Sequence, residues 1–584
     1  MTHTQSRQQP PSEVRSLSIA LTGSGGAGVI TAGGMIVEAA ARAGWYALMT
    51  RSVGPQIRGG EAAALVRLST APVETHNDRF DILLALDWLN FERFAGEIPL
   101  APQTVAIVDP AAGEVPEVVR ESGATRLDLP LQALLEANPG IRANMLALGV
   151  IAALIGLKVK DIDRLIVSKL AHKGERVVTA SQTAVRLGVD AAADFMVPVH
   201  LTAPQRGRDR WLISGNQATG LGAVRGGIRF VAGYPITPAT EVLEWMAPAL
   251  AKVGGTLVQA EDELASINMA IGASFGGTPS LTATSGPGFA LMTEALGLAT
   301  AAEIPVVVVD VMRGGPSTGI PTKSEQSDLN IAIYGCHGDA PHIVVAPMSI
   351  GDCLFTTQWA VHLAETLQVP TVVLSDQYLG QARAVVDAPA DVAFVSNREI
   401  AGGRGAEPYA RYAVGGDCVS PMAVPGTSGC QYTADGLAHT ERGLPSTRAD
   451  DHLAQLDKRS NKLTRFDYGR HWGMTEGDGE MAVITWGSTT APVREALERL
   501  RDQGFEARLV ALRLIAPVPT EQLALALKGV HRALIVEQTH SRQFYHYLRG
   551  HCDLPADTRG LNRPGPLPFR AGELVDEISK WQTS

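Results

Sequence analysis

The stretch Thr256-Leu-Val-Gln259, followed by Glu261-Asp-Glu-Leu264 and an apolar run to Phe275, sets the fold of the middle of the chain. The first four residues predict a strand. The run Leu264-Ala-Ser-Ile-Asn-Met-Ala-Ile-Gly-Ala-Ser-Phe275 predicts a helix. A strand that passes directly into a helix, with further strands on both sides in sequence, is typical of an α/β fold.

Three acids stand at this strand-to-helix junction. Burial raises the pKa of a carboxyl group, whereas a helix N-terminus lowers it. A carboxylate balanced between these effects suits proton relay to a cofactor nitrogen. The alternative is that acids favour the first turn of any helix. The motifs around the junction favour the functional interpretation.

The bulk composition limits the class of protein. At 584 residues the chain is expected to form roughly three domains. It has 45% hydrophobic and 19% charged residues, with 60 Gly and 35 Pro, which is typical of a loop-rich α/β enzyme. A net charge of -10 argues against a nucleic-acid partner. The longest apolar runs, 145–157 and 304–309, are too short to span a bilayer, and no secretory signal is present. We therefore expect a soluble, cytoplasmic protein.

The pattern of strands and helices divides the chain into several doubly wound α/β domains. In the first domain the apolar strands alternate with helices, which predicts a parallel sheet. Residues 144–187 are expected to be helical. Residues 397–472 show little periodicity and predict a long arm rather than a packed layer. The expected segments are a disordered tail (1–15), a first α/β domain (16–199), a linker (200–210), a second α/β domain (211–396), the arm or linker (397–472) and a small parallel α/β domain (473–584).

A glycine-rich loop follows the first strand. Gly23, Gly25 and Gly28 satisfy G-x-G-x-x-G, so backbone amides there could contact phosphate. A dinucleotide fold also needs an acid at the end of the second strand. That strand ends in Arg51 and Ser52, which disfavours nicotinamide or flavin binding. A tight turn at a subunit or phosphate contact is the preferred interpretation.

Four other patterns carry weaker predictions. Gly315-Pro-Ser-Thr-Gly319 fits a nucleophile elbow, but Ile-Pro-Thr follows it and a helix cannot begin there. Gly477-Asp-Gly479 resembles the start of a thiamine-diphosphate metal motif, yet no asparagine follows until Asn562. Four histidines lie close in sequence without metal spacing and are expected on the surface: His531, His540, His546 and His551. Five scattered cysteines predict reduced thiols rather than a metal or cluster site: Cys336, Cys353, Cys418, Cys430 and Cys552.

Four motifs follow one another in the middle of the chain: Tyr234-Pro-Ile-Thr-Pro238, Glu261-Asp-Glu-Leu-Ala265, Thr284-Ser-Gly-Pro-Gly288 and Arg313-Gly-Gly-Pro-Ser-Thr-Gly-Ile-Pro-Thr322. Together they resemble the α subunit of 2-oxoacid:ferredoxin oxidoreductases. The N-terminal stretch, with the Gly23 loop and Ser52-Val-Gly-Pro-Gln-Ile-Arg-Gly-Gly60, is similar to the γ subunit. The C-terminal part, with Trp486-Gly-Ser488, Ile515-Ala-Pro517 and Val536-Glu-Gln538, resembles the transketolase-C-terminal-type domain. The resemblance implies a γ–α fusion.

The resemblance also implies where a cofactor and a substrate bind. In this family, thiamine diphosphate lies between a pyrimidine-binding domain of the α subunit and a diphosphate-binding domain of a β subunit. One junction acid contacts the pyrimidine N1′. Glu263 is the first choice, because it stands nine residues before Gly272, and Glu261 is the second. Thr237 and Arg313 are placed near the 2-oxo acid, although Arg313 could instead be a surface arginine that caps a loop. The implied cofactor-binding set is Tyr234, Pro235, Ile236, Thr237, Glu263, Ser285 and Gly286, and no metal ligand is implied in this chain.

The implied enzyme is CoA-acylating and active only with its β subunit, which also holds Mg²⁺ and a [4Fe–4S] cluster. Oxidative decarboxylation of 2-oxoglutarate to succinyl-CoA and CO2, with ferredoxin reduction and possible reversal to fix CO2, is the expected reaction. Coenzyme A and ferredoxin are then co-substrate and partner in a dimer of heterodimers. The alternatives are pyruvate or another 2-oxo acid, a thiamine-dependent decarboxylase that does not use ferredoxin, and a non-catalytic scaffold.

Overall fold

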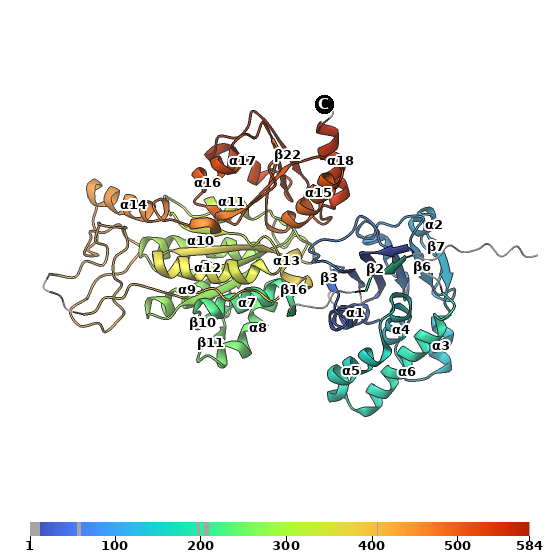
Figure 1. Cartoon of the computed structure of the whole chain (residues 1–584). Helices are drawn as coiled ribbons and strands as arrows, with labels where there is room; N and C mark the ends of the chain where they lie inside the picture. Colours follow the sequence, from blue (N-terminus) through green and yellow to red (C-terminus); the bar gives the residue numbers. More distant parts are fainter. Residues whose placement is uncertain are drawn as a thin grey trace, which may run out of the picture. The chain divides into compact units, whose positions relative to one another are not determined.

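The computed structural model describes residues 12–54, 60–195, 199–203, 209–403, 405 and 407–582. The chain forms two compact units. The first unit contains the residues up to Ile213 together with Ala382–Pro389, and the second contains Ser214–Gln381 and the residues from Ala390 onward. In Figure 1 the first unit carries the labels β2, α1 and α6, and the second carries the labels from α7 to α18.

The first unit is built on an eight-stranded sheet with the strand order β7-β6-β5-β2-β4-β3-β16-β9. Strands β7, β6, β5 and β2 are parallel, as the sequence predicted. The prediction of a parallel sheet fails at β4, which runs antiparallel to both β2 and β3. Local apolar patterns indicate a strand but not its direction, which is set by tertiary pairing. The strands are β2 (Ser16–Ser24), β3 (Tyr46–Val53), β4 (Glu61–Ser69), β5 (Ile82–Ala85), β6 (Val105–Val108), β7 (Thr125–Asp128), β9 (Arg210–Ser214) and β16 (Arg383–Asp387).

The first unit also contains six α-helices among its described residues. The predicted helical region 144–187 is confirmed as three consecutive helices, of which α4 is apolar on all sides and almost completely buried. Such a helix packs as a core element rather than as a surface helix. The helices are α1 (Val29–Ala43), α2 (Glu117–Glu121), α3 (Leu131–Ala137), α4 (Ala143–Ile155), α5 (Val159–Leu170) and α6 (Glu175–Ala191).

The predicted tail and linker are partly ordered against each other. Residues 12–14 form β1 (Ser12–Val14), which pairs in parallel with β8 (Val199–Leu201). The prediction of disorder therefore fails for residues 12–14, because backbone pairing with the linker supplies order that composition does not reveal. Residues 1–11, and residues 204–208 of the predicted linker, lie outside the described residues.

The second unit begins with a seven-stranded sheet of order β11-β10-β12-β13-β15-β14-β20. Its first six strands are parallel, which confirms the prediction. The long apolar strands β13 and β15 are fully buried, as expected for strands covered on both faces. The strands are β10 (Phe230–Gly233), β11 (Thr256–Gln259), β12 (Ser280–Thr284), β13 (Val306–Met312), β14 (Ile343–Val345), β15 (Pro370–Asp376) and β20 (Leu514–Ala516).

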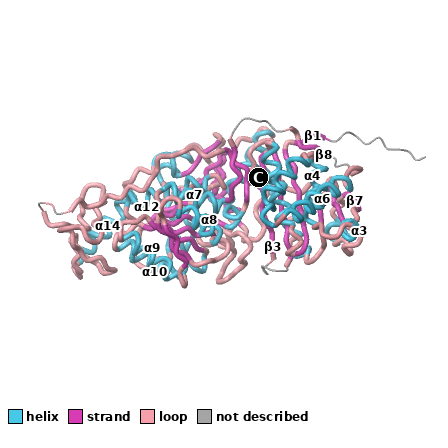
Figure 2. Tube along the Cα trace, turned by 90° about the horizontal axis from the view of Figure 1, so that it is seen from below, coloured by secondary structure: helices cyan, strands magenta, loops and turns pink. Residues whose placement is uncertain are grey.

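Helices cover both faces of this sheet. In Figure 2, α7, α8 and α12 lie together on one side of the strands, and α9 and α10 lie on the other. Close packing within the first group depends on glycine, because a Cβ at Gly222 would lie 2.2 Å from the Leu354 carbonyl oxygen of α12. The helices are α7 (Gly215–Gly226), α8 (Thr240–Ala251), α9 (Glu263–Phe275), α10 (Gly286–Ala301), α11 (Leu329–Tyr334), α12 (Asp352–Leu367) and α13 (Gln377–Gln381).

A smaller sheet of order β17-β19-β18-β21-β22 forms the C-terminal part of the second unit. Four of its strands are parallel, as predicted, and β17 is an antiparallel edge strand. Strand β20 leaves this part of the chain and pairs with β14, so one continuous hydrophobic core contains residues of both sheets. The elements are β17 (Gly473–Glu476), β18 (Met481–Trp486), α15 (Thr490–Asp502), β19 (Arg508–Leu512), α16 (Thr520–Ala526), β21 (Arg532–Glu537), α17 (Gln543–His551), β22 (Asp557–Asn562) and α18 (Ala571–Gln582).

The predicted arm, residues 397–472, is more structured than its composition suggested. It contains a sixteen-residue helix, α14 (Ala449–Thr464), and a short 3₁₀ helix, Gly469–Trp472. Arg411, Tyr412 and Lys458 are completely buried. The prediction that this segment is not a packed layer is therefore wrong for these parts. Charged side chains in this segment predict exposure to solvent. The sequence alone does not show the oppositely charged partners that allow such side chains to be buried.

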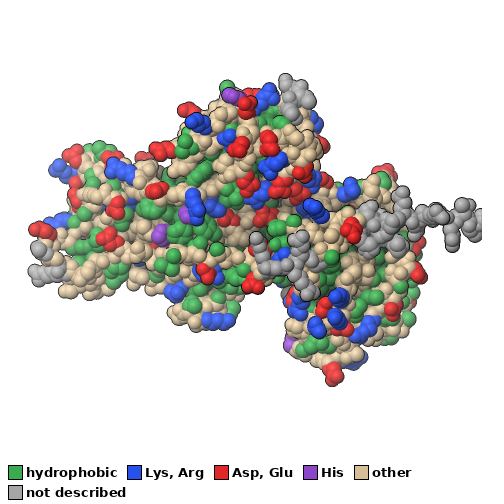
Figure 3. Space-filling model, in the orientation of Figure 1, with side chains coloured by type: hydrophobic (Ala, Val, Ile, Leu, Met, Phe, Trp, Pro, Cys, Tyr) green, Lys and Arg blue, Asp and Glu red, His purple; other side chains and the backbone are tan. Residues whose placement is uncertain are grey.

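Charges of both signs are spread over the surface. On the face shown in Figure 3, acidic and basic side chains intermingle over the C-terminal elements. None of the helices in the described part of the chain is long and apolar enough to cross a membrane.

Candidate active site

The loops that carry the central motifs follow four neighbouring parallel strands. Strands β11, β10, β12 and β13 are adjacent in the sheet, and each passes at its carboxyl end into one motif. The carboxyl ends of parallel strands lie at one edge, where open α/β sheets bind their ligands. The topology therefore gathers the residues around Thr237, Glu263, Ser285 and Arg313 at a single edge.

The three junction acids have different positions. Asp262 is the N-cap of α9, and its side chain accepts a hydrogen bond from the backbone N–H of Ala265 at 2.7 Å. Glu263 is the first residue of α9 and is 8% exposed, whereas Glu261 is exposed. An N-cap carboxylate fixes where a helix begins. Capping by Asp262 therefore places Glu263 on the inner side of the helix.

Glu263 packs against the start of α10. A Cβ at Gly288 would lie 2.6 Å from Glu263 Oε1 and 2.2 Å from Thr284 Oγ1, so only glycine fits there. No N–H or O–H group of the described residues donates to the Glu263 carboxylate. Gly272 is the glycine nine residues after Glu263. A Cβ added at Gly272 would have no neighbouring atom within 4 Å among those considered outside its own helix backbone. Within this chain, the glycine that accommodates Glu263 is thus Gly288 rather than Gly272.

Arg313 and Thr237 are brought together. Arg313 follows β13, is 6% exposed, and its Nη1 donates a hydrogen bond to the Thr237 carbonyl oxygen. The Asn216 side chain also holds this loop, donating to the Pro238 carbonyl oxygen at 3.0 Å. Burial lowers the pKa of the Arg313 guanidinium. These contacts do not fit the alternative of a surface arginine that caps a loop.

The remaining predicted residues lie on the same loops. Tyr234 is 39% exposed and Pro235 is also exposed, whereas Ile236 and Thr237 are half-buried. Ser285 is the N-cap of α10, and its completely buried hydroxyl has no hydrogen-bond partner among the described residues. A buried hydroxyl without a partner is costly unless a ligand or water satisfies it. This orphan group and the donor-free Glu263 carboxylate are the features that a bound polar cofactor would satisfy.

Two acids that the sequence analysis did not single out lie beside these residues. Asp310 is completely buried within β13. Asp328 precedes α11 and is half-buried, with its Oδ2 atom buried. A Cβ at Gly286 would lie 2.6 Å from Asp328 Oδ2, so the Asp328 carboxyl packs directly on the start of α10. The sequence Val306-Val-Val-Val-Asp310 could have indicated Asp310 as unusual. A carboxyl group inside a buried apolar strand is costly unless it is neutralised or paired.

The segment after Arg313 also contacts the C-terminal sheet. The completely buried Gln326 exchanges backbone and side-chain hydrogen bonds with Gln538, at 2.9 and 2.8 Å, and its Nε2 donates to the Trp486 carbonyl oxygen at 2.9 Å. Gln538 and Trp486 belong to the C-terminal motifs noted in the sequence. Those motifs therefore position the segment that ends in Asp328.

The other sequence patterns lie elsewhere. In the G-x-G-x-x-G loop, Gly28 is left-handed, with φ 82°, and its carbonyl oxygen accepts from Asn144. Strand β4 stands between β2 and β3, so the parallel pair of a dinucleotide fold does not form. Residues 55–59 of the adjoining γ-like motif lie outside the described residues. Gly314 pairs with Ile320 around the G-x-S-x-G pattern, and the next described helix is α11.

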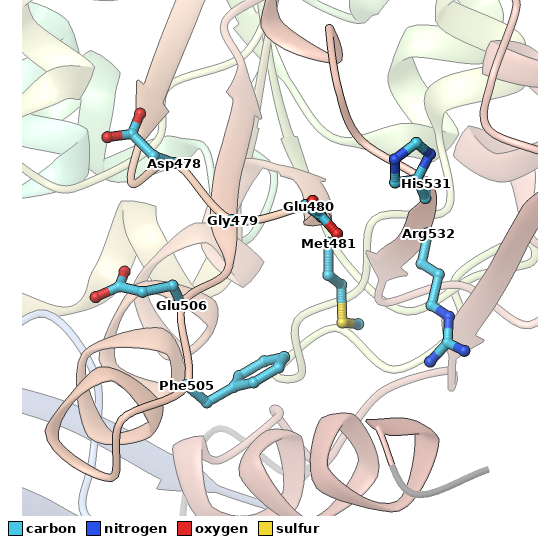
Figure 4. A pocket seen from close by; sticks show the side chains of 8 residues that line it. All are labelled: Asp478, Gly479, Glu480, Met481, Phe505, Glu506, His531 and Arg532. Carbon is cyan, nitrogen blue, oxygen red and sulfur yellow. The ribbon is translucent and has the colours of Figure 1, made fainter.

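A hollow of about 550 Å³ opens at the amino ends of the C-terminal strands. Figure 4 shows Asp478, Glu480 and Glu506 around it, with His531 and Arg532 on the opposite side. The Gly-Asp-Gly pattern and His531 both line this hollow. The four histidines His531, His540, His546 and His551 are all exposed, as expected. No group of three metal-ligating side chains occurs within the described ranges. The hollow lies at the strand ends opposite to those that carry Trp486 and Gln538.

Comparisons with known proteins cover up to 97% of the chain. Three family models match, described as "Pyruvate ferredoxin/flavodoxin oxidoreductase" (residues 18–191), "Pyruvate flavodoxin/ferredoxin oxidoreductase, thiamine diP-bdg" (221–458) and "Transketolase, C-terminal domain" (472–543). The second match contains the four loops of the candidate site.

Curated relatives and a solved structure agree with these matches. The chain is 31% identical to 2-oxoacid:ferredoxin oxidoreductase 2, subunit alpha, of Aeropyrum pernix, over 97% of each chain. It is 30% identical to 2-oxoglutarate oxidoreductase subunit KorA of Mycobacterium tuberculosis, over 89% of this chain and 83% of the relative. A structure of 2-oxoglutarate:ferredoxin oxidoreductase from Magnetococcus marinus, with 2-oxoglutarate, coenzyme A and succinyl-CoA bound, superposes with a TM-score of 0.90. That chain is 35% identical and is covered over 99% of its length, against 97% of this chain.

The fold and these matches define an oxidoreductase subunit with a thiamine-diphosphate-binding domain between a γ-type domain and a transketolase-C-terminal-type domain. The chain belongs to the 2-oxoacid:ferredoxin oxidoreductase family, as an α subunit.

Proposed function

We propose that this chain supplies the pyrimidine-binding half of the active site of a CoA-acylating 2-oxoglutarate:ferredoxin oxidoreductase. The reaction is the oxidative decarboxylation of 2-oxoglutarate to succinyl-CoA and CO2 with reduction of ferredoxin, and it can run in reverse. The observation that carries the proposal is the gathering of Glu263, Arg313 and Thr237 at the carboxyl ends of adjacent strands. The names of the relatives from Mycobacterium tuberculosis and Magnetococcus marinus support 2-oxoglutarate over other 2-oxo acids.

The proposed cofactor is thiamine diphosphate, which when bound supplies the nucleophilic carbon and the electron sink for decarboxylation. Glu263 is assigned to its pyrimidine N1′. This carboxylate is buried, lacks a protein donor and is held in place by Gly288. It can therefore accept a hydrogen bond from a protonated ring nitrogen and hold that proton. The Ser285 hydroxyl and the loop of Tyr234, Pro235, Ile236 and Thr237 complete the proposed contacts, next to Gly286.

Arg313 and Thr237 are assigned to the 2-oxo acid. The guanidinium is nearly buried, and its Nε has no hydrogen-bond partner among the described residues. A planar guanidinium binds a carboxylate through two parallel hydrogen bonds. The bond from Arg313 to the Thr237 carbonyl oxygen fixes the guanidinium relative to the loop after β10. Substrate binding would thus be oriented by residues from two strands.

We expect Arg313→Ala to reduce kcat/KM for 2-oxoglutarate roughly 30-fold or more, mainly through KM. Loss of one partner of a buried charge pair costs about 2–5 kcal/mol, and the lower figure corresponds to this factor. Arg313→Lys should recover only part, because an ammonium cannot reproduce the planar fork. Steady-state kinetics of the assembled enzyme test this. Unchanged 2-oxoglutarate kinetics in Arg313→Ala would mean that the partner chain builds the substrate pocket.

The other half of the site is assigned to a β subunit that binds the cofactor diphosphate through Mg²⁺ and carries a [4Fe–4S] cluster. The proposed assembly is a dimer of such heterodimers, with ferredoxin as electron acceptor. In this chain all five cysteines are free thiols, and burial raises the pKa values of Cys336 and Cys552 to about 11. Thiolates are the ligands of iron–sulfur clusters, so these cysteines are poorly suited to hold one.

The purified chain alone is expected to be inactive and to lack iron–sulfur absorbance. Addition of the β subunit should restore CoA-dependent reduction of ferredoxin or of a low-potential dye. The assay measures turnover with 2-oxoglutarate and with pyruvate, in the presence and absence of CoA. Iron–sulfur absorbance stoichiometric with the isolated chain would contradict the assigned division between the subunits. Turnover of pyruvate in preference to 2-oxoglutarate would mean that pyruvate is the substrate. CoA-independent turnover without dye reduction would favour a thiamine-dependent decarboxylase that does not use ferredoxin.

A further inference from the structure

The completely buried Asp310 and the half-buried Asp328 form an acidic pair beside Arg313. Asp310 is completely buried, and no N–H or O–H group of the described residues donates to either of its oxygens. The carboxyl group of Asp328 adjoins it, and the buried Oδ2 of Asp328 likewise has no hydrogen-bond partner among the described residues. Two ionised carboxylates that share a buried site repel each other, and one proton between them removes this repulsion. The burial and the missing donors therefore indicate that the pair holds a proton.

Among the described residues, the positive charge of Arg313 acts on both carboxyl groups, and Glu325 adds a negative charge beside Asp328. Glu325 in turn faces His540. On the side of α10, the Asp328 carboxyl packs against Gly286 near the helix N-terminus. Burial and mutual repulsion raise the pKa of Asp310, and burial together with Glu325 raises that of Asp328.

We propose that Asp310 and Asp328 share one proton in the empty site, and that their remaining negative charge balances the Arg313 guanidinium until a substrate carboxylate replaces it. The pair is a positioning device and does not touch the reacting atoms. When a 2-oxo acid binds, two negative charges face one guanidinium in a buried site, which favours protonation of the pair. The proton comes from the acid form of the buffer, which is left as its conjugate base, and it adds to the ionised oxygen of the pair. No other bond is made or broken.

The first test concerns the proton and does not depend on the proposed function. Infrared spectroscopy of the full-length chain at neutral pH should show the C=O stretch of a buried protonated carboxyl group. Asp310→Asn should remove this band, because the amide N–H takes the place of the shared proton and leaves Asp328 ionised. Asp352→Asn is the control, since Asp352 accepts two hydrogen bonds from Arg513 and should contribute no such band. A wild-type spectrum that Asp310→Asn leaves unchanged would refute the shared proton.

The second test measures proton uptake and rests on the proposed function. Calorimetric titration of the α–β complex with 2-oxoglutarate, in buffers of different ionisation enthalpy, should show uptake of a fraction of one proton near pH 7. The dissociation constant should rise with pH by at most about tenfold per unit. Asp310→Asn should retain the uptake, because Asp328 still titrates. The double variant Asp310→Asn/Asp328→Asn should lose it, and its binding should become independent of pH in this range.

The outcomes separate the two proposals. Binding of 2-oxoglutarate to the wild-type complex without proton uptake would refute the charge replacement, while the proposed enzyme activity would stand. A carboxyl band that disappears in Asp310→Asn, together with no 2-oxoglutarate binding, would support the shared proton and overturn the proposed substrate. If the double variant fails to fold, as shown by its unfolding temperature, Asp310→Asn still decides the infrared test.

Discussion

Glu263→Gln is expected to reduce turnover of the assembled enzyme by about 10²–10⁴-fold, the usual contribution of a positioned acid–base group. Glutamine matches glutamate in size, so the packing on Gly288 should persist and the cofactor should still bind. What the amide cannot do is hold the ring-nitrogen proton as a carboxylate does. The effect should therefore fall on kcat and on exchange of the cofactor C2 proton rather than on cofactor affinity.

Glu261→Gln provides the matched comparison. It changes an exposed acid two residues away, the second choice at the same junction. Steady-state kinetics and C2-proton exchange by NMR should be affected far less than in Glu263→Gln. If Glu263→Gln turns over normally while Glu261→Gln does not, the assignment must be exchanged. Normal turnover in both variants would place the proton-holding group outside this junction.

Glu303→Gln is expected to destabilise the second unit by about 3–5 kcal/mol, the cost typical of removing one partner of a buried ion pair. The Glu303 carboxylate is completely buried and bonds Lys458 Nζ at 2.6 Å and Lys462 Nζ at 3.0 Å. These contacts, with Arg411 nearby, hold its pKa far below the usual range, against the opposing effect of burial. Burial in turn lowers the pKa of Lys462 to about 8. Without the carboxylate, cations would remain buried and unbalanced.

Chemical denaturation and limited proteolysis test this expectation. The transition of the second unit should shift to lower denaturant, and cleavage within residues 397–472 should become faster, because Lys458 and Lys462 anchor α14. Glu577→Gln is the control. It breaks the pair between Glu577 and Lys580, whose side chains are 48% and 71% exposed, and exposed ion pairs contribute little to stability. Equal stability of Glu303→Gln and Glu577→Gln would show that the buried cluster does not anchor the segment.

The sequence predicted the strands of the second sheet better than the details of the candidate site. The strand-to-helix pattern around Gln259 and the valine run before Asp310 predicted two of these strands, and both are present as β11 and β13. Three adjacent acids, however, all fit the start of a helix. The distinction between Glu261 and Glu263 depends on the cap made by Asp262 and on packing against Gly288, which is distant in sequence.

Other features depend on partners that no local pattern reveals. The antiparallel direction of β4 is set by pairing with β2 and β3. Lys458 and Lys462 resemble solvated helix charges until Glu303 is placed between them. Asp310 and Asp328 are separated by the Arg313 loop, and only the folded sheet brings them together.

The pairing of β14 with β20 limits where this chain can be truncated. The match to the transketolase-type family begins at residue 472, which suggests a convenient place to truncate. A fragment that ends there would lack β20, and it would leave the β14 edge and the polar groups of Gln326 without their partners. An unpaired apolar sheet edge is a template for aggregation. The C-terminal region thus behaves as the border of the preceding sheet, and a usable fragment of the second unit has to include it.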